Sequence, residues 1–267
     1  MKKTLVVLFC IFILKNSFAQ ILSHGTSIII AATKDSIWIA ADSKVISQSV
    51  NNIDDIISSN NKCKIFNYSG IEYAISGTAI ITNENGDTIF NADKELLASL
   101  KCTNNIFAAA ADFNKKTFQS LKFVYQHLFK KMNKSSLDKW FSGNQSAILG
   151  YSLNSFSSTG HPNSTNISFQ LNGDKNKWEI DTLDGGKLTD FTIINTMIFS
   201  FLGFTEIIPS LLNSNPSFFN TGTIKDKLTE LIRLEIKAHP TFVGEPISIK
   251  ALYVGGQKWL THDDICP

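Results

Sequence analysis

The chain lacks a strong net charge: 25 Lys and Arg face 23 Asp and Glu, which leaves +2 at neutral pH over 267 residues. So small a charge argues against partners such as nucleic acid or an acidic membrane surface. The basic residues also form no stripe interleaved with aromatics, the pattern typical of a nucleic-acid interface. With 43% apolar and 18% charged residues, the composition predicts a globular protein with a full core.

Motifs for metal, phosphate and serine chemistry are also missing. There is no His-Glu-x-x-His, and the five histidines show no metal-ligand spacing. There is no Gly-x-Ser-x-Gly elbow and no phosphate-binding glycine loop. We therefore expect neither a metal nor an organic cofactor.

Cysteine is scarce, and no Cys-x-x-Cys occurs. Cys10 falls in an N-terminal segment that we expect to be removed, so Cys63, Cys102 and Cys266 remain. An odd number in an exported protein permits one disulfide and one free thiol. The sequence leaves the pairing open.

The first residues are typical of a secretory signal peptide. Lys2 and Lys3 precede a short apolar run over 4–14, and Ser17-Phe18-Ala19 supplies small residues before a cut. We expect a signal peptide over 1–19, a start at Gln20, and a secreted or periplasmic protein. The run is too short to span a bilayer, so no stable membrane span is expected after its removal; an uncleaved anchor or a buried strand is the alternative.

Hydrophobic periodicity predicts strands, then helices, then strands, a helix and strands again. Polar residues over 45–61 and 154–163 predict loops. The predicted strands cover 27–33, 36–41, 64–68, 72–76, 146–152, 166–171, 177–182, 247–254 and 258–260, and the predicted helices cover 92–101, 106–132 and 224–238. This order predicts a single domain of the α+β class, in which two packed antiparallel sheets are flanked by helices.

The most informative feature is a Gly25–Thr26 bond at the head of a predicted strand. If this bond is cut, Thr26 carries both a hydroxyl and a free α-amine, so a nucleophile and a base lie on one residue. That amine has an ordinary pKa of about 7.7–8.0, against about 10.4 for lysine. It can therefore accept a proton near neutral pH, as a general base must.

Several spaced segments together resemble proteasome β subunits, which are N-terminal-nucleophile hydrolases. Asp42 stands 16 residues after Thr26, as in that family. The matching segments are Leu22-Ser23-His24-Gly25-Thr26-Ser27, Ile37-Trp38-Ile39-Ala40-Ala41-Asp42-Ser43-Lys44, Lys62-Cys63-Lys64-Ile65-Phe66, Ala74-Ile75-Ser76-Gly77-Thr78-Ala79 and Val243-Gly244-Glu245-Pro246-Ile247-Ser248-Ile249.

The resemblance implies a four-layer αββα sandwich over 26–267, preceded by a short propeptide over 20–25. It implies a nucleophile at Thr26, with Asp42 and Lys64 as its charge partners, and an oxyanion-binding backbone N–H at Gly77. Lys62 is a rival for Lys64, since strand alternation puts both on one face. The implied activity is hydrolysis of peptides or other amides after self-cleavage, and relatives assemble into rings, so a homo-oligomeric ring is possible.

The chain also departs from the family pattern near its end. The family places an Asp and a Ser shortly before the late glycines, where this chain has His239-Pro240-Thr241-Phe242-Val243, and Glu245 replaces the second glycine. His239 or Thr241 is a candidate substitute, and the loose match over 200–205 receives no role. A non-catalytic structural or binding subunit with the same fold is therefore the alternative function.

Overall fold

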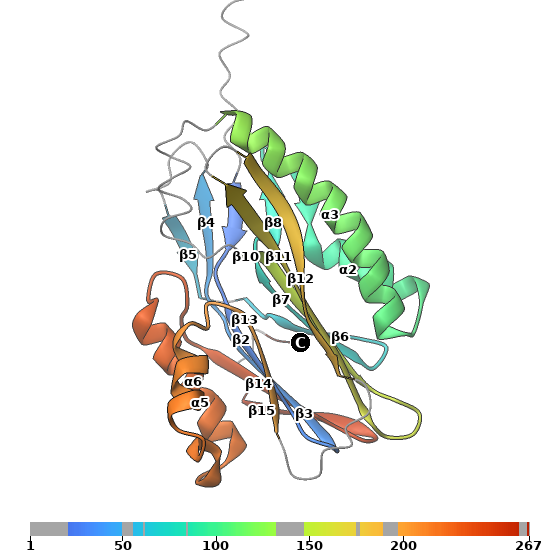
Figure 1. The fold of residues 1–267 in the computed structure, drawn as a ribbon, viewed down its shortest axis with the longest axis vertical. Coiled ribbons are helices and arrows are strands. Elements are labelled where there is room, and N and C mark those ends of the chain that lie inside the picture. Colours follow the sequence, from blue (N-terminus) through green and yellow to red (C-terminus); the bar gives the residue numbers. More distant parts are fainter. Residues whose placement is uncertain are drawn as a thin grey trace, which may run out of the picture.

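The computed structural model describes residues 21–49, 56–60, 62–83, 85–131, 147–174, 177–188, 197–261 and 266. The predicted signal peptide lies outside the described residues. The fold is mixed α+β, with antiparallel sheets and helices (Figure 1). No helix in the described part of the chain is long and apolar enough to cross a membrane.

Sheet I carries the hairpin predicted from the first apolar runs. β2 (Ser27–Ala32) and β3 (Ser36–Asp42) pair antiparallel around a short polar turn. Apart from Trp38 and Asp42, their residues are β-branched or small, and almost all are buried, which suits strands covered on both faces. The sheet order is β13-β2-β3-β14-β15, with β13 (Ile198–Gly203), β14 (Ile247–Tyr253) and β15 (Gly256–Thr261).

Sheet II has the order β12-β11-β10-β7-β6. The predicted hairpin is confirmed as β6 (Ile65–Tyr68) and β7 (Ile71–Gly77), and β11 (Pro162–Asp174) pairs with β12 (Lys177–Leu188) as expected. β10 (Ala147–Phe156) and β11 take up half of 154–163, which the sequence predicts as a loop. The two strands are paired from Phe156↔Pro162 to Ala147↔Gln170. Pairing between the strands therefore extends into residues whose polar composition predicts a loop.

Helices cover the two sheets on opposite sides of the molecule (Figure 1). α2 (Ala92–Cys102) and α3 (Ile106–Lys131) pack against sheet II, and α5 (Ile207–Ser214), α6 (Ile224–Ala238) and the short helix η1 (Phe218–Asn220) pack against sheet I. A third apolar cluster, which includes Ile30 and Ile39 from sheet I and Ile65 and Ala74 from sheet II, lies between the sheets.

Local capping signals explain why the helix ends match the sequence prediction. Thr223 accepts a hydrogen bond from Asp226 N at 3.1 Å at the start of α6, and Asn91 accepts one from Lys94 N at 3.0 Å at the start of α2. α6 ends at Ala238, two residues before Pro240, which cannot continue a helix.

The described residues form a third sheet, although the sequence predicts only two. Its order is β5-β4-β1-β8-β9, with β1 (Ile21–His24), β4 (Val45–Ser49), β5 (Ile56–Ser59), β8 (Ile80–Thr82) and β9 (Thr88–Asn91). β4 and β5 occupy parts of the loop expected over 45–61, because Ile46 has a fully buried side chain and the two Ser-rich strands pair with each other and, through β4, with β1.

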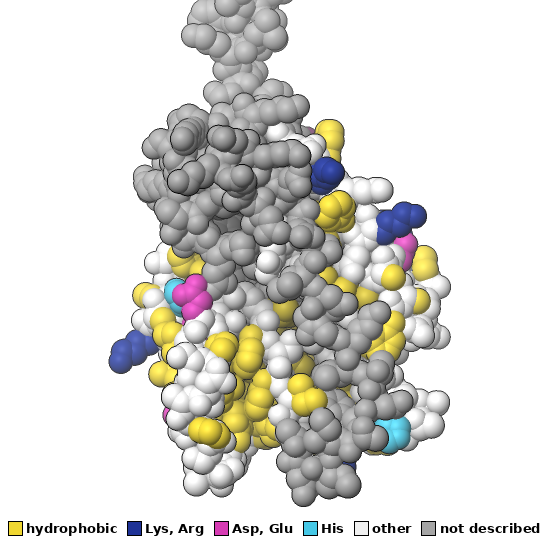
Figure 2. Space-filling model, in the orientation of Figure 1, with side chains coloured by type: hydrophobic (Ala, Val, Ile, Leu, Met, Phe, Trp, Pro, Cys, Tyr) yellow, Lys and Arg dark blue, Asp and Glu magenta, His cyan; other side chains and the backbone are white. Residues whose placement is uncertain are grey.

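Charge is scattered over the surface as the composition suggests. On the face shown in Figure 2, the coloured Lys, Arg, Asp and Glu side chains form no patch of one sign, and one basic side chain lies against an acidic one.

Candidate active site

Thr26 lies at the junction between β1 and β2 and is only 3% exposed. Its hydroxyl donates a hydrogen bond to the carbonyl oxygen of Gly25, so nucleophile and preceding peptide bond face each other. Gly25 has a φ of +96°, and a Cβ there would lie 2.7 Å from the carbonyl oxygen of Phe242. Only glycine fits this position without strain or collision.

The backbone of Thr26 is held by a turn to which no role was assigned from the sequence. Phe204 N–H donates to the carbonyl oxygen of Thr26 at 2.8 Å. The residue before it, Gly203, has a φ of +78°, and a Cβ there would lie 2.1 Å from the same oxygen. The loose family match over 200–205 therefore marks the turn that holds the predicted nucleophile.

Asp42 ends β3 and is 1% exposed. Its Oδ1 accepts hydrogen bonds from Ser27 N at 2.8 Å and from Lys64 Nζ at 2.9 Å, while its Oδ2 accepts from Lys44 N at 3.1 Å and Gly244 N at 3.0 Å. Each carboxylate oxygen thus has two donors, as expected for a buried ionised carboxylate. Through Ser27, Asp42 also fixes the residue next to Thr26.

Lys64 is 5% exposed and makes the buried ion pair with Asp42, whereas its rival Lys62 is exposed. Lys64 Nζ also donates to the carbonyl oxygen of Lys44. Burial lowers the pKa of Lys64 below its ordinary value, because desolvation disfavours the ammonium, and the nearby Asp42 carboxylate opposes this shift.

Gly77 ends β7 with a φ of +79°, and a Cβ there would lie 2.5 Å from the carbonyl oxygen of Ile148. The next residue, Thr78, donates its N–H to the same oxygen at 2.6 Å. The tight contact requires glycine, and it holds this strand end beside the predicted nucleophile.

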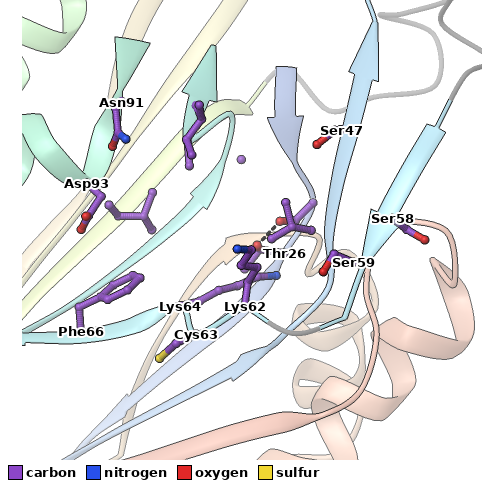
Figure 3. Close-up of a pocket in the computed structure, with 16 residues that line it drawn as sticks. Thr26, Ser47, Ser58, Ser59, Lys62, Cys63, Lys64, Phe66, Asn91 and Asp93 are labelled. Atoms are coloured by element: carbon purple, nitrogen blue, oxygen red, sulfur yellow. Dashed lines mark hydrogen bonds between the residues drawn. The ribbon is translucent and has the colours of Figure 1, made fainter. Parts of the chain in front are cut away.

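These residues border one cavity of about 350 Å³. Thr26, Lys64 and Gly77 all line it, and Asp42 supports Lys64 from behind. Figure 3 shows Thr26, Lys62 and Lys64 grouped together, with Asn91 and Asp93 across the cavity from them. The other lining residues are mostly apolar or small: Gly25, Val45, Ser47, Ser58, Ser59, Cys63, Phe66, Ile75, Ala79 and Ile80.

The two candidate substitutes for the missing Asp do not line this cavity. His239 is the C-cap of α6, and its ring lies 5.3 Å from that of Phe204. Thr241 is exposed. The late segment contributes backbone instead, since Gly244 N–H binds Asp42, while Glu245 points outward to Arg233 at 3.0 Å.

The structure pairs Cys63 with Cys266 in a disulfide and leaves Cys102 exposed with a free thiol. Cys63 also lines the cavity, directly beside Lys64. Among the described residues, no group of three His, Cys, Asp or Glu side chains is placed to hold a metal ion.

Comparison with known proteins gives little beyond this geometry. No protein-family model matches the chain, and no curated protein does. Among solved structures, the chain is similar to the Anbu (Gly-1) mutant from Hyphomicrobium sp. strain MC1, with 13% sequence identity over 90% of this chain and 89% of that one, and a TM-score of 0.46. A likeness this distant assigns neither fold nor activity, so the functional conclusion rests on the site.

Proposed function

We propose that this protein is a threonine-type amide hydrolase that uses Thr26 as its N-terminal nucleophile after cleaving its own Gly25–Thr26 bond. The observation that carries the proposal is the Thr26 hydroxyl held against the Gly25 carbonyl, in a cavity that also contains the buried Lys64 of the Asp42 ion pair. The apolar clusters on both faces of sheet I and on the helix side of sheet II support a four-layer αββα sandwich as the fold.

Self-cleavage would begin between Thr26 and the Gly25 carbonyl group, whose oxygen accepts a hydrogen bond from the Thr26 hydroxyl, and would be completed by water. The Thr26 oxygen attacks the Gly25 carbonyl carbon, the C–N bond breaks, and the hydroxyl proton goes to the departing nitrogen. Water then hydrolyses the resulting ester, which leaves a carboxylate on Gly25 and restores the hydroxyl. Thr26 now bears a free α-amine.

In the processed enzyme, the α-amine takes the hydroxyl proton as Thr26 attacks a substrate amide. The ammonium of Lys64 stabilises the developing negative charge on the Thr26 oxygen, and Asp42 keeps Lys64 charged in spite of its burial. The Gly77 N–H donates a hydrogen bond to the oxyanion that forms on the substrate carbonyl. Neither His239 nor Thr241 takes the place of the family's Asp at this cavity.

The strand β1 indicates how a peptide substrate binds. Its residues pair antiparallel with β4 on one side, from Ile21↔Ser49 to His24↔Ile46, and with β8 on the other. Once Thr26 is freed, an extended peptide in this place aims its own scissile carbonyl at the nucleophile, as β1 aims Gly25. We propose peptides or other amides in extended form as the substrate class.

The test is N-terminal sequencing and intact mass of the purified protein, combined with a panel of fluorogenic peptides. We expect the chain to begin at Thr26 and to hydrolyse at least one peptide. Thr26→Ala should retain residues 20–25 and have no activity. Thr26→Ser, which keeps a hydroxyl and an α-amine, should still process itself; activity in the alanine variant would refute the proposal.

The same samples test export and assembly. A start at Gln20 in Thr26→Ala, recovered outside the cytoplasm, would support the signal peptide over 1–19 and the secreted or periplasmic location. Light scattering of the processed protein would test the homo-oligomeric ring.

One observation favours the alternative, a non-catalytic structural or binding subunit. β1 is paired on both sides and ends just before Gly25 and Thr26, so the uncut chain has a strand at the centre of the third sheet beside the site. A wild-type protein that keeps its start at Gln20 and hydrolyses no peptide would establish this reading.

A further inference from the structure

The short segment that carries Lys64 is not part of a strand. Residues 62–64 precede β6, and Lys62 N–H donates to the carbonyl oxygen of Ser43 at 3.2 Å. The Lys64 side chain is held by Asp42 and by the carbonyl of Lys44. Figure 3 shows the Cys63 side chain near Lys62 and Lys64, with its sulfur pointing away from Thr26.

The disulfide joins this segment to Cys266, which contacts a residue of β14. Cys266 is 2% exposed, and its sulfur lies 3.6 Å from the hydroxyl oxygen of buried Ser248. Ser248 belongs to β14, whose pairing with β3 places Ile247 opposite Asp42. The disulfide therefore links the Lys64 segment to Cys266, whose sulfur contacts β14, and β14 pairs with the strand that ends at Asp42.

We propose that the Cys63–Cys266 disulfide is a positioning device for the Lys64 ammonium, so that full activity requires the oxidised protein. The connection runs from Asp42 along β3 to β14, across to Cys266, and through the disulfide to the residue beside Lys64. Opening the disulfide leaves the ion pair as the main side-chain restraint on Lys64, and water then reaches the ammonium. Displacements of about 1 Å in a catalytic group cost up to about 100-fold in rate.

The inference rests on the proposed function, but one readout does not. A disulfide that closes a loop of 203 residues also stabilises the fold, so a lower melting temperature alone would not support positioning. The discriminating readout is the pH midpoint at which Lys64 becomes reactive to reductive methylation, followed by peptide mass spectrometry. Burial lowers the pKa of Lys64, so admitting water should move this midpoint up toward that of an exposed lysine.

The experiment compares the oxidised Cys102→Ser protein with the Cys63→Ser/Cys266→Ser variant in the same background, at a temperature where both are folded. Removing Cys102, which is exposed, prevents alternative pairing. We expect kcat on the best peptide to fall at least tenfold, with KM changed less than threefold, and the Lys64 midpoint to rise. Leu231→Ala, which opens a cavity under α6, is the control that destabilises the fold and should leave both readouts unchanged.

Each outcome decides something different. An unchanged kcat and an unchanged midpoint, with only a lower melting temperature, would overturn the positioning role. If no form hydrolyses any peptide, the proposed function fails and the midpoint alone decides the positioning. If the double variant does not fold, graded reduction and reoxidation of the Cys102→Ser protein replaces it: kcat and midpoint should follow the disulfide fraction reversibly, and independence from it would refute the proposal.

Discussion

Replacing Asp42 by asparagine should destabilise the protein far more than the loss of one charge on the surface does. Asp42 presents two oxygens to four donors: three backbone N–H groups and Lys64 Nζ. In Asp42→Asn one oxygen becomes an NH₂ group, so whichever way the amide turns, two donors face another donor. Each unsatisfied buried group costs about 1–3 kcal/mol.

The ammonium of Lys64 adds to this loss, because it remains buried without its counter-charge. Breaking a buried ion pair from one side typically costs about 3–5 kcal/mol, and we expect the free energy of unfolding of Asp42→Asn to fall by about that amount. Urea denaturation at pH 7 measures it. The matched control is Glu230→Gln, which removes a surface pair with Lys227 and should cost under about 1 kcal/mol.

Two further measurements test the reasoning. Without Asp42, nothing opposes the lowering of the Lys64 pKa by desolvation, so the lysine of the variant loses its proton at a lower pH than in the wild type. Raising the pH toward the ordinary lysine pKa should therefore recover part of the lost free energy of unfolding. Adding Lys64→Met should likewise recover part of it. A drop of less than about 1 kcal/mol in Asp42→Asn, or no recovery in the double variant, would refute the view that burial of this pair governs the site.

Four other predictions concern Gly203, Glu235 and Lys64. Gly203→Ala should abolish self-cleavage at Thr26 and destabilise the fold by more than about 3 kcal/mol, because its Cβ would collide with the Thr26 carbonyl; Gly255→Ala, at a similar φ of +85° with open space around it, should cost only about 1–2 kcal/mol by chemical denaturation and still be processed. The buried Glu235 accepts hydrogen bonds from two backbone N–H groups at the start of α5, so Glu235→Ala should cost about 2–3 kcal/mol, while Glu235→Gln keeps that acceptor and should cost less than half as much. Burial also raises the pKa of Glu235, so the wild type should lose stability as pH rises from about 4.5 through the raised value, and Glu235→Gln should lack this loss in thermal melts at several pH values. Finally, the alkaline limb of kcat should fall at a pH below 10.5, because burial lowers the pKa of Lys64; a limb at or above that pH would contradict a charged Lys64 in catalysis.

The parts of the fold that the sequence predicts well are those with local signals. The hairpin of β2 and β3 has β-branched runs around a polar turn, and α6 has a capping threonine at one end and a proline after the other. The sequence did not predict β1, β4 and β5, since these short segments become strands only by pairing with one another and, through β1, with β8. Their stability comes from tertiary contacts, which no local pattern records.

The candidate site likewise contains residues that the sequence could indicate and residues that it could not. Four site residues could be selected from the sequence because their side chains, or the lack of one, fit a known chemistry: Thr26, Asp42, Lys64 and Gly77. The structure brings these residues together. Their catalytic roles stay predictions. Gly203 and Gly244 act through backbone position and backbone N–H groups, so only their glycine identity hinted at them. The pairing of the cysteines could not be read from their number.

The place of β1 in the middle of its sheet has a consequence for how such an enzyme would start working. A cut after Gly25 severs one covalent bond but leaves the short leader hydrogen-bonded along both sides, in the place proposed for peptides. The freed leader would then act as the enzyme's first inhibitor. Freshly processed protein should show a lag set by departure of this fragment, independent of enzyme concentration and shortened by mild denaturant.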